Sequence, residues 1–174
     1  MEETEYNRIL QDNSDMVYRL AFGYMKNRED AEDIYQNVFL KLLRHKRPFS
    51  NPEYEKRWLI RVTINECHSL YRSLRRRYWQ SSEELWPLLE KQQSDETVED
   101  VAMSLHSEEV IADLLRDIPD KYSAVLYLFY FEEYSTKEIA DILKRKESTI
   151  RTQLQRGRDI LWKKMMESAW YQTD

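Results

Sequence analysis

The sequence predicts an all-α protein that consists of two small helical domains joined by a flexible acidic linker. Only two glycines and four prolines occur among the 174 residues, which leaves little material for the tight turns of β-sheets. Leu, Glu, Arg and Lys are plentiful, and all four favour helices. Twelve Tyr and five Trp supply apolar bulk for two small cores, although 34% of the residues are charged.

Charge is distributed unevenly along the chain, although the net charge is only −5. Residues 1–80 contain 15 Lys and Arg against 12 Asp and Glu, and residues 114–174 contain 11 against 10. Residues 81–113 contain one Lys and ten acids. Like charges repel and little of this stretch can be buried, which is typical of a flexible connector. We therefore predict helical domains at residues 1–80 and 108–174, with an acidic linker at residues 81–107.

The first two helices are predicted from apolar side chains at spacings of three and four residues. Asn13 or Ser14 is expected to cap the first helix, and Asn27 is expected to end it. The second helix is expected to begin near Glu29 and Asp30, because acidic side chains favour the positive N-terminal end of a helix.

A third helix follows a loop that Pro48 and Pro52 force on the chain. It begins at about Tyr54 and ends in a basic segment in which aromatic residues are interleaved, with Arg72, Arg75, Arg76, Arg77, Tyr71, Tyr78 and Trp79. Arg mixed with aromatics is typical of a platform for single-stranded nucleic acid, on which bases stack and phosphates are neutralised. The alternative is a cationic helix C-terminus that satisfies its own dipole.

The C-terminal domain is predicted to end in a helix-turn-helix. Short helices are expected at residues 109–116 and 121–131, and the second should bury Val125, Leu126, Leu128 and Phe129. Ser135 and Glu138 then form an S-x-x-E capping box, which marks the start of a further helix. Residues 144–147 interrupt the apolar period and form a turn. Beyond the turn, one stripe of a last helix carries Ile150, Leu154, Gly157 and Leu161.

The opposite stripe of that last helix is polar and basic, with Arg151, Thr152, Gln155, Arg156 and Arg158. Arg donates in pairs to a guanine edge and Gln to an adenine edge, and the major groove of DNA admits an α-helix. This pattern favours docking on duplex DNA. An ordinary solvated face of an amphipathic helix is the alternative.

Other sequence features argue against an exported, membrane or enzymatic protein. Cys67 cannot form an internal disulfide by itself, the first thirty residues contain no signal segment, and no apolar run could span a bilayer, so we expect a cytoplasmic protein. The three histidines, at positions 45, 68 and 106, are dispersed, and no catalytic or phosphate-loop motif occurs. We expect no catalysis, no cofactor, no metal and no small-molecule substrate.

Two non-enzymatic alternatives stay open at this point. A dimeric repressor or activator with a helix-turn-helix needs a dimer seam to place two recognition helices about one DNA turn apart, and the sequence offers no heptad seam. A protein-interaction adaptor could use the acidic stretch as its active part.

Three segments, in this order, resemble bacterial sigma factors of the extracytoplasmic-function group, which retain only region 2 and region 4. They are DAEDIYQNVFLKL at residues 30–42, WLIRVTINECHSLYR at residues 58–72 and STKEIADILKRKESTIRTQLQRGRDIL at residues 135–161. The resemblance implies a promoter-recognising initiation factor. It also implies three partners: core polymerase through the clamp of its largest subunit and its flap, promoter DNA, and an anti-sigma factor that is often membrane-linked.

The resemblance further implies roles for particular residues. Asp30, Glu32, Asp33 and Gln36 would contact core polymerase, as would Phe39, for which we prefer burial in the domain. Asn65, Arg61 and Arg72, with Phe49 in the preceding loop and Arg76 in the basic segment, would capture the melted −10 strand. Arg151, Thr152, Gln155 and Arg156, with Lys146 and Thr149 near the start of the helix, would face the −35 duplex.

Three positions depart from the pattern of the group. Lys144 stands where Gly is usual, Lys146 where a small capping residue is usual, and Ser69 where Asp is common. A non-Gly residue at position 144 either adopts a positive φ at some cost or changes the turn.

Overall fold

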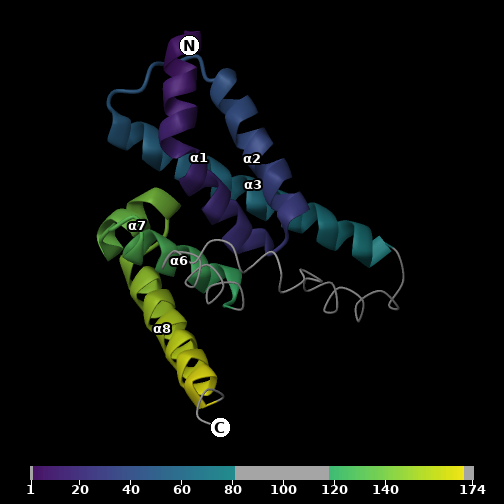
Figure 1. Ribbon diagram of the computed structural model, residues 1–174, viewed down its shortest axis with the longest axis vertical. Helices are drawn as coiled ribbons and strands as arrows, with labels where there is room; N and C mark the ends of the chain where they lie inside the picture. Colours follow the sequence, from purple (N-terminus) through teal and green to yellow (C-terminus); the bar gives the residue numbers. More distant parts are fainter. Residues whose placement is uncertain (1, 81–117, 171–174) are drawn as a thin grey trace. The chain divides into compact units, whose positions relative to one another are not determined.

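The computed structural model describes residues 2–80 and 118–170, in which six helices and no strand occur (Figure 1). The chain divides into two compact units, Met1–Met103 and Ser104–Asp174, here called the N-terminal and C-terminal units. The prediction of an all-α protein is confirmed for these ranges. The predicted linker at residues 81–107 and the predicted helix at residues 109–116 lie outside the described residues.

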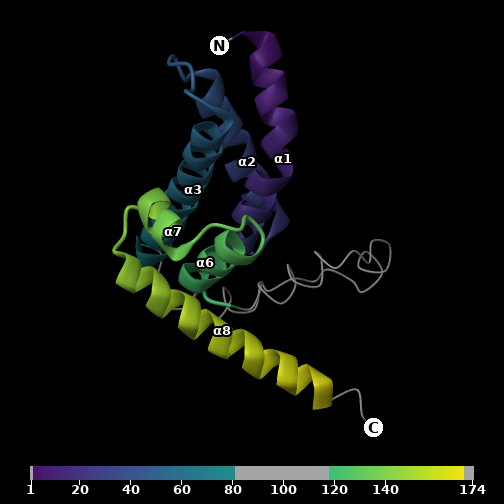
Figure 2. The same ribbon diagram turned by 90° about the vertical axis from the view of Figure 1, so that its left-hand side faces the viewer.

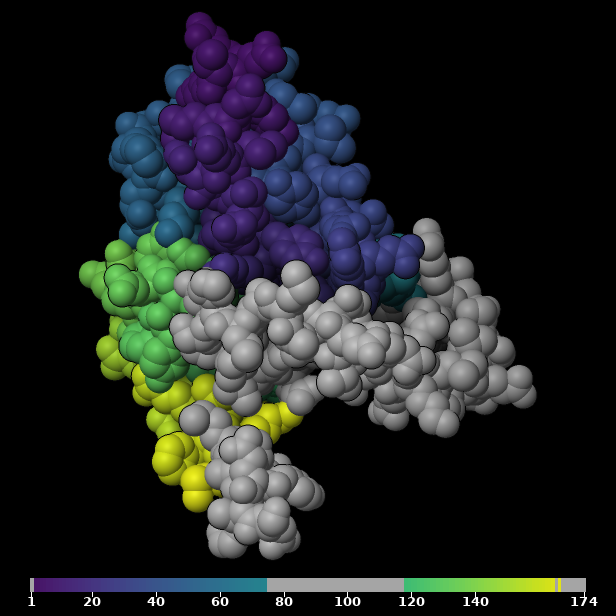
Figure 3. All heavy atoms as spheres, viewed as in Figure 1, coloured from purple at the N-terminus to yellow at the C-terminus, as the bar shows by residue number. Residues whose placement is uncertain are grey.

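Three helices that pack on one another form the N-terminal unit. They are α1 (Glu3–Met25), α2 (Arg28–Leu43) and α3 (Pro52–Gln80), and each contacts both others. In the space-filling view, the atoms of α1 are bordered by those of the later helices of this unit (Figure 3). The largest fully buried side chains of the three-helix core are Ile9, Leu20, Ile34, Leu42, Leu59 and Ile60.

The expected cap at Asn13 or Ser14 is wrong, because α1 begins about ten residues earlier, at Glu3. Asn13 is buried inside the helix, where its Nδ2 donates to the carbonyl oxygen of Ile9 at 2.9 Å and to Oε1 of Glu55 at 3.4 Å. Glu55 is only 3% exposed, and its Oε2 accepts a 2.8 Å hydrogen bond from Nη2 of Arg8. The buried amide nitrogen of Asn13 therefore has hydrogen-bond partners inside the unit, and α1 continues through this residue.

Asn27 is the N-cap of α2. The expectation that this residue ends α1 is therefore corrected. Lys26 caps α1 in a left-handed conformation, with φ 58°, and its N–H donates to the carbonyl oxygen of Phe22 at 2.8 Å. Oδ1 of Asn27 accepts a 2.8 Å hydrogen bond from the backbone N–H of Asp30. Since Asn favours helix N-caps as well as turns, a two-residue connection uses it for the helix that follows.

In its described residues, 118–170, the C-terminal unit contains α6 (Asp120–Tyr130), α7 (Thr136–Leu143) and α8 (Glu147–Trp170). Figure 2 shows α6 and α7 along the first half of α8, whose second half extends beyond them. The core of this unit includes Ile118, Leu126, Leu128, Ile139, Ile142 and Ile150. Phe129, which was expected to be buried, is only partly so, because it lies at the edge of α6 with the guanidinium of Arg158 5.3 Å from its ring centroid.

The helix-turn-helix of α7 and α8 has the predicted capping box and a strained turn. Oγ of Ser135 accepts from the N–H of Glu138 at 3.3 Å, and Oε2 of Glu138 accepts from the N–H of Ser135 at 2.9 Å. Lys144 follows α7 with φ 54° and ψ 46°, so this lysine adopts the left-handed conformation that usually falls to glycine. A side chain in that conformation costs roughly 1–2 kcal/mol.

Gly157 allows α8 to approach α6 closely. A Cβ atom built at this position would lie 2.9 Å from Cδ1 of Leu126 and 3.2 Å from Cβ of Tyr122. Gly157 is buried, in line with its place on the predicted inward stripe. The absence of a side chain therefore sets the distance between the two helices.

Candidate nucleic-acid interface

The predicted −35 contacts all lie exposed, in the first half of α8 or just before it. This set comprises Lys146, Thr149, Arg151, Thr152, Gln155 and Arg156. The opposite side of the same helix turns Ile150, Leu154 and Gly157 into the core. For these residues the expected division of α8 into an inward apolar stripe and an outward polar stripe is confirmed, whereas Leu161, which was expected on the inward stripe, is only partly buried.

Arg151 is held by a network that also joins the two helices of the helix-turn-helix. Its Nη2 lies 2.7 Å from Oε1 of Glu147, which also accepts a 2.9 Å hydrogen bond from Oγ1 of Thr136. The hydrogen bond from Thr136 and the one from Arg151 together hold the pKa of Glu147 below its ordinary value. The guanidinium of Arg151 is thereby oriented by the first residue of α8.

Other polar side chains of this face have partners within α8. Nε2 of Gln155 donates to Oδ1 of Asp159 at 3.0 Å, and Oγ1 of Thr152 donates to the carbonyl oxygen of Ser148 at 2.9 Å. A contact from the Gln155 amide nitrogen to a base edge would therefore exchange one hydrogen bond for another.

Arg158 does not belong to the outward stripe, which corrects its predicted place. Its Nε donates to the hydroxyl of Tyr130 at 2.7 Å, and its guanidinium lies 5.6 Å from the ring centroid of Tyr130. The residue follows Gly157, where α8 passes closest to α6, so its side chain packs against the aromatic end of α6.

A groove of about 300 Å³ opens between the start of α6 and the outward face of α8. Its lining consists of Lys121, Tyr122, Ser148, Thr149, Thr152, Gln153 and Arg156. A hydrogen bond from Arg156, and a weaker effect of one from Lys121, keeps the pKa of Tyr122 below its ordinary value. Sequence reasoning missed Lys121 and Tyr122, because nothing in their spacing indicates that the start of α6 borders the last helix.

Two of the predicted −10 contacts on α3, Asn65 and Arg72, line a second groove, of about 290 Å³, together with His68 and Tyr71. Asn65 and Arg72 are exposed, and Arg61 is partly buried. The ring of His68 meets that of Tyr24 edge-on, with 5.5 Å between the centroids. The side chain of Arg76 lies outside the described residues.

Phe49 belongs to an aromatic cluster that anchors the loop before α3. Its ring stacks on His45 at 4.6 Å and 8° between planes, and lies 5.5 Å from Trp58 and 6.3 Å from Tyr54. His45 and Trp58 are themselves 4.7 Å apart. The predicted capture residue is thus partly buried among rings, and sequence reasoning did not anticipate the part of His45.

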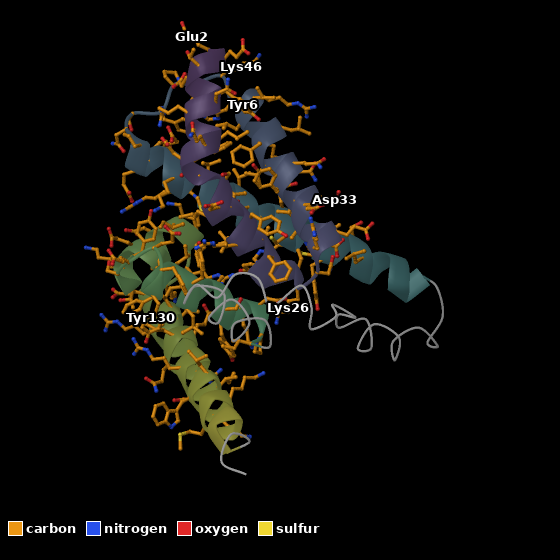
Figure 4. The ribbon with its side chains drawn as sticks, in the orientation of Figure 1. Glu2, Tyr6, Lys26, Asp33, Lys46 and Tyr130 are labelled. Atoms are coloured by element: carbon orange, nitrogen blue, oxygen red, sulfur yellow. The ribbon has the colours of Figure 1, made fainter. Side chains whose placement is uncertain are left out.

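An exposed stripe runs along α2 and includes part of the predicted polymerase-binding set. Glu32, Asp33 and Gln36 are exposed, and Asp33 lies on the outer side of α2 in Figure 4. Asp30 is partly buried, and its Oδ2 accepts a 2.7 Å hydrogen bond from Nδ2 of Asn27, so it serves the start of the helix.

Two leucines continue this stripe toward the end of α2. Leu40 is 47% exposed and Leu43 is 52% exposed, and they follow Asp33 and Gln36 at helical spacing. Sequence reasoning missed them, because leucine in an amphipathic helix is expected inside. Phe39 is only 3% exposed, which confirms the preferred interpretation of burial in the domain.

The described ranges hold no group of three or more His, Cys, Asp or Glu side chains that could bind a metal ion. No helix in these ranges combines the length and the apolar character that crossing a membrane requires. Features of the described surface that could contact a partner include two grooves with basic residues and one mixed acidic and apolar stripe.

Comparison with known proteins assigns both units. Residues 9–77 match the family profile described as Sigma-70 region 2, and residues 108–161 match the one described as Sigma-70, region 4. RNA polymerase sigma factor SigV of Bacillus subtilis (strain 168) is 27% identical over 155 residues, which cover 87% of this chain and 86% of SigV. ECF RNA polymerase sigma factor SigW of the same strain is 27% identical over 171 residues, which cover 95% of this chain and 91% of SigW.

A solved structure shares the fold. The sigma factor RpoE of Bartonella quintana, crystallised with the anti-sigma factor NepR, matches with a TM-score of 0.68 and 17% identity, over 91% of this chain and 95% of RpoE. The chain belongs to the extracytoplasmic-function sigma factors of the sigma-70 family, with region 2 and region 4 only. It directs RNA polymerase to promoters through these two regions, and the family is non-enzymatic.

Proposed function

We propose that the two units divide promoter recognition between them, with α8 docked on the −35 duplex and α3 holding the melted −10 strand. The observation that carries this proposal is that all six predicted −35 residues are exposed, in the first half of the second helix of a helix-turn-helix or just before it. A recognition helix contacts base edges with its N-terminal residues, so the side chains nearest the start of α8, those of Lys146, Thr149, Arg151 and Thr152, are in position for readout.

The groove on α3 supports the −10 part of this proposal. Asn65 offers an amide to a base edge, Tyr71 and His68 offer rings for stacking, and Arg72 offers a positive charge to the backbone. The aromatic cluster around Phe49 fixes the loop that would lie beside the extruded base. Extruding a base costs a few kcal/mol, which stacking and hydrogen bonding in such a pocket would offset.

Core polymerase is the proposed partner of the exposed stripe on α2. The stripe consists of Asp33, Gln36, Leu40 and Leu43, with Glu32 beside it. Apolar side chains flanked by acids suit a partner surface that is basic around an apolar centre. Since polymerase works in the cytoplasm, we place the protein there.

An anti-sigma factor is a further proposed partner. The matched RpoE of Bartonella quintana was solved with the anti-sigma factor NepR, which supports the idea for this chain. A membrane link of that partner is proposed from the resemblance alone. Residues 81–107, which carry acids and one Lys, are proposed as a linker between domains at residues 1–80 and 108–174.

Run-off transcription with purified core polymerase tests the proposed function. We expect the full chain to direct initiation from a defined set of genomic fragments, whose start sites share −35 and −10 sequences. Replacing Arg151 by Ala should relax the base preference within the −35 element. Replacing Asn65 by Ala should reduce the formation of open complexes, in which the −10 DNA is melted. Transcription from random ends only would contradict the proposal.

A further inference from the structure

Two positively charged side chains and the phenol of Tyr122 line the same groove, where α6 begins beside α8. Arg156 comes from α8 and Lys121 from α6, and both lower the pKa of this phenol, Arg156 more strongly. The ammonium group of Lys121 also lies 4.9 Å from the centroid of the Tyr122 ring. Because Tyr122 is only 8% exposed, its ring is fixed in the core and its hydroxyl offers both cations a rigid anchor.

The groove beside this anchor suits an anion. Among the described residues that line it, two carry a positive charge and none is a carboxylate. The hydroxyls of Ser148 and Thr149 stand on its rim at the start of α8. Two cations held together repel each other, and an anion between them relieves that repulsion.

Arg156 is poorly placed for a base contact. It follows Glu147, the first residue of α8, by nine residues, which is about 14 Å along a helix that rises 1.5 Å per residue. Base edges are contacted by the N-terminal residues of a recognition helix. Paired recognition of guanine also needs two donors of the guanidinium at once. Here the guanidinium lies in one groove with the phenol of Tyr122, a residue of another helix, whose pKa it lowers.

We propose that Lys121, Tyr122 and Arg156 form a clamp for one backbone phosphate of the −35 duplex, in which Tyr122 is the positioning residue. The inference rests on the proposed docking of α8 on that duplex. It moves Arg156 from base readout to a sequence-independent contact, and it adds two residues of α6 to the interface. Base readout falls to the side chains nearer the start of α8.

Holoenzyme assembled from core polymerase and the full chain tests the clamp. Its affinity is measured for promoter duplexes with single-base changes in the −35 element, at a series of salt concentrations. We expect each of two substitutions, Lys121→Gln and Arg156→Gln, to weaken binding by a factor that is the same for every duplex. Each should also reduce the slope of log affinity against log salt concentration by about 0.9. Lys163→Gln removes an exposed charge of α8 outside the groove and should leave the slope unchanged.

Tyr122→Phe isolates the positioning role, since it keeps the ring and removes only the hydroxyl. It should weaken binding uniformly in the natural background and cause no further loss in the Arg156→Gln background. Tyr130→Phe is the matched control, because that hydroxyl accepts from Arg158 and not from Arg156. It should leave affinity unchanged.

A synthetic duplex identifies the ligand as a backbone phosphate. Methylphosphonate groups, which carry no charge, are placed at one −35 position at a time. At one position, the neutral group should cost the natural protein about as much affinity as the Arg156→Gln substitution costs on natural DNA. The Arg156→Gln variant should lose no further affinity at that position. If this variant loses as much affinity there as at every other position, no phosphate is clamped.

Two results would overturn the inference. A changed ranking of the −35 duplexes by Arg156→Gln would make this residue a base reader. Additive losses from Tyr122→Phe and Arg156→Gln would show that the phenol does not position the guanidinium. If the natural holoenzyme itself shows no preference among the −35 duplexes, the proposed docking of α8 fails, which is a separate outcome.

Discussion

Thr136, the first residue of α7, donates a 2.9 Å hydrogen bond from its hydroxyl to Oε1 of Glu147, the first residue of α8. The same oxygen accepts from Nη2 of Arg151 at 2.7 Å. One carboxylate therefore fixes the start of the recognition helix against the helix before it and orients an exposed arginine. This contact crosses the turn that Lys144 makes with a positive φ.

Acid should weaken the C-terminal unit through Glu147. The pKa of this carboxyl is lowered by the hydrogen bond from Thr136 and then by Arg151, so its folded value lies below the ordinary 4.5. A lowered folded pKa stabilises the fold above the unfolded value, and that contribution is lost as the pH falls through the folded value. As the pH is lowered from neutral to below 4.5, the melting temperature should fall more steeply for the natural protein than for Glu147→Gln. Parallel profiles would contradict this role.

Gly157→Ala should destabilise the C-terminal unit. The added methyl would lie 2.9 Å from Cδ1 of Leu126 and 3.2 Å from Cβ of Tyr122, and overpacking of this kind costs about 1–3 kcal/mol. Helix propensity returns about 1 kcal/mol, so the net loss should be roughly 1 kcal/mol. Denaturant unfolding followed by circular dichroism measures it. Asp141→Ala, at an exposed position of α7, should change stability by less than about 0.5 kcal/mol. A gain for Gly157→Ala would mean that the helices move apart freely.

Lys144→Gly should stabilise the same unit. The left-handed conformation at φ 54° costs a side chain roughly 1–2 kcal/mol, and glycine avoids that cost while losing about 0.5–1 kcal/mol in backbone entropy. A net gain of about 0.5–1 kcal/mol is expected in the same unfolding experiment. Lys144→Ala keeps the strain and removes the charge, so it should bring no gain. Equal effects of the two substitutions would point to charge and not to backbone geometry.

Arg8→Met should destabilise the N-terminal unit by roughly 1–3 kcal/mol, because it removes a charged hydrogen bond to a carboxylate that is only 3% exposed. Adding Glu55→Leu removes the carboxylate that would otherwise stay buried without its cation. The double substitution should therefore cost less than the sum of the single ones. Denaturant unfolding of the two single variants and of the double variant tests this. Additive losses would show that the two side chains act separately.

Asp33→Lys should weaken binding to core polymerase by roughly tenfold, or about 1.4 kcal/mol, if the exposed stripe of α2 is the contact surface. Since Asp33 is exposed, unfolding of the free protein should be nearly unchanged. Glu3→Lys, an equal charge reversal at an exposed position of α1, is the control and should leave affinity as it is. Fluorescence titration of labelled core polymerase gives both values, and an unchanged affinity for Asp33→Lys would remove this face from the interface.

Local signals in the sequence predict the helical architecture well. The S-x-x-E capping box, the interruption at residues 144–147 and the spacing of Ile150, Leu154 and Gly157 define the helix-turn-helix without any tertiary information. The same spacing predicts which side of α8 is exposed. These features depend on residues within one or two turns of each other, where periodicity is informative.

Contacts between helices that are distant in sequence could not be predicted in this way. Arg8 and Glu55 lie 47 residues apart, and each would be assigned to solvent by its charge alone. The meeting of Lys121 and Tyr122 with Arg156 depends on how closely α6 crosses α8, which Gly157 sets. The packing of Arg158 on Tyr130 is of the same kind, since the two residues lie 28 positions apart and come from different helices. Asn27 was assigned to the wrong helix end, because Asn suits both ends.

The loop before α3 is held in place by a cluster of four rings and not by the side chains that it exposes. These rings belong to His45, Phe49, Tyr54 and Trp58. Rings from within the loop and from α3 fix the backbone, while Lys46, Arg47 and Ser50 remain exposed between them. Substitutions at these three positions leave the anchors in place. The loop is therefore a fixed frame with exposed side chains at three positions. If it lies beside the −10 strand as proposed, a library that varies these three codons should yield new −10 specificities without redesign of the domain that carries it.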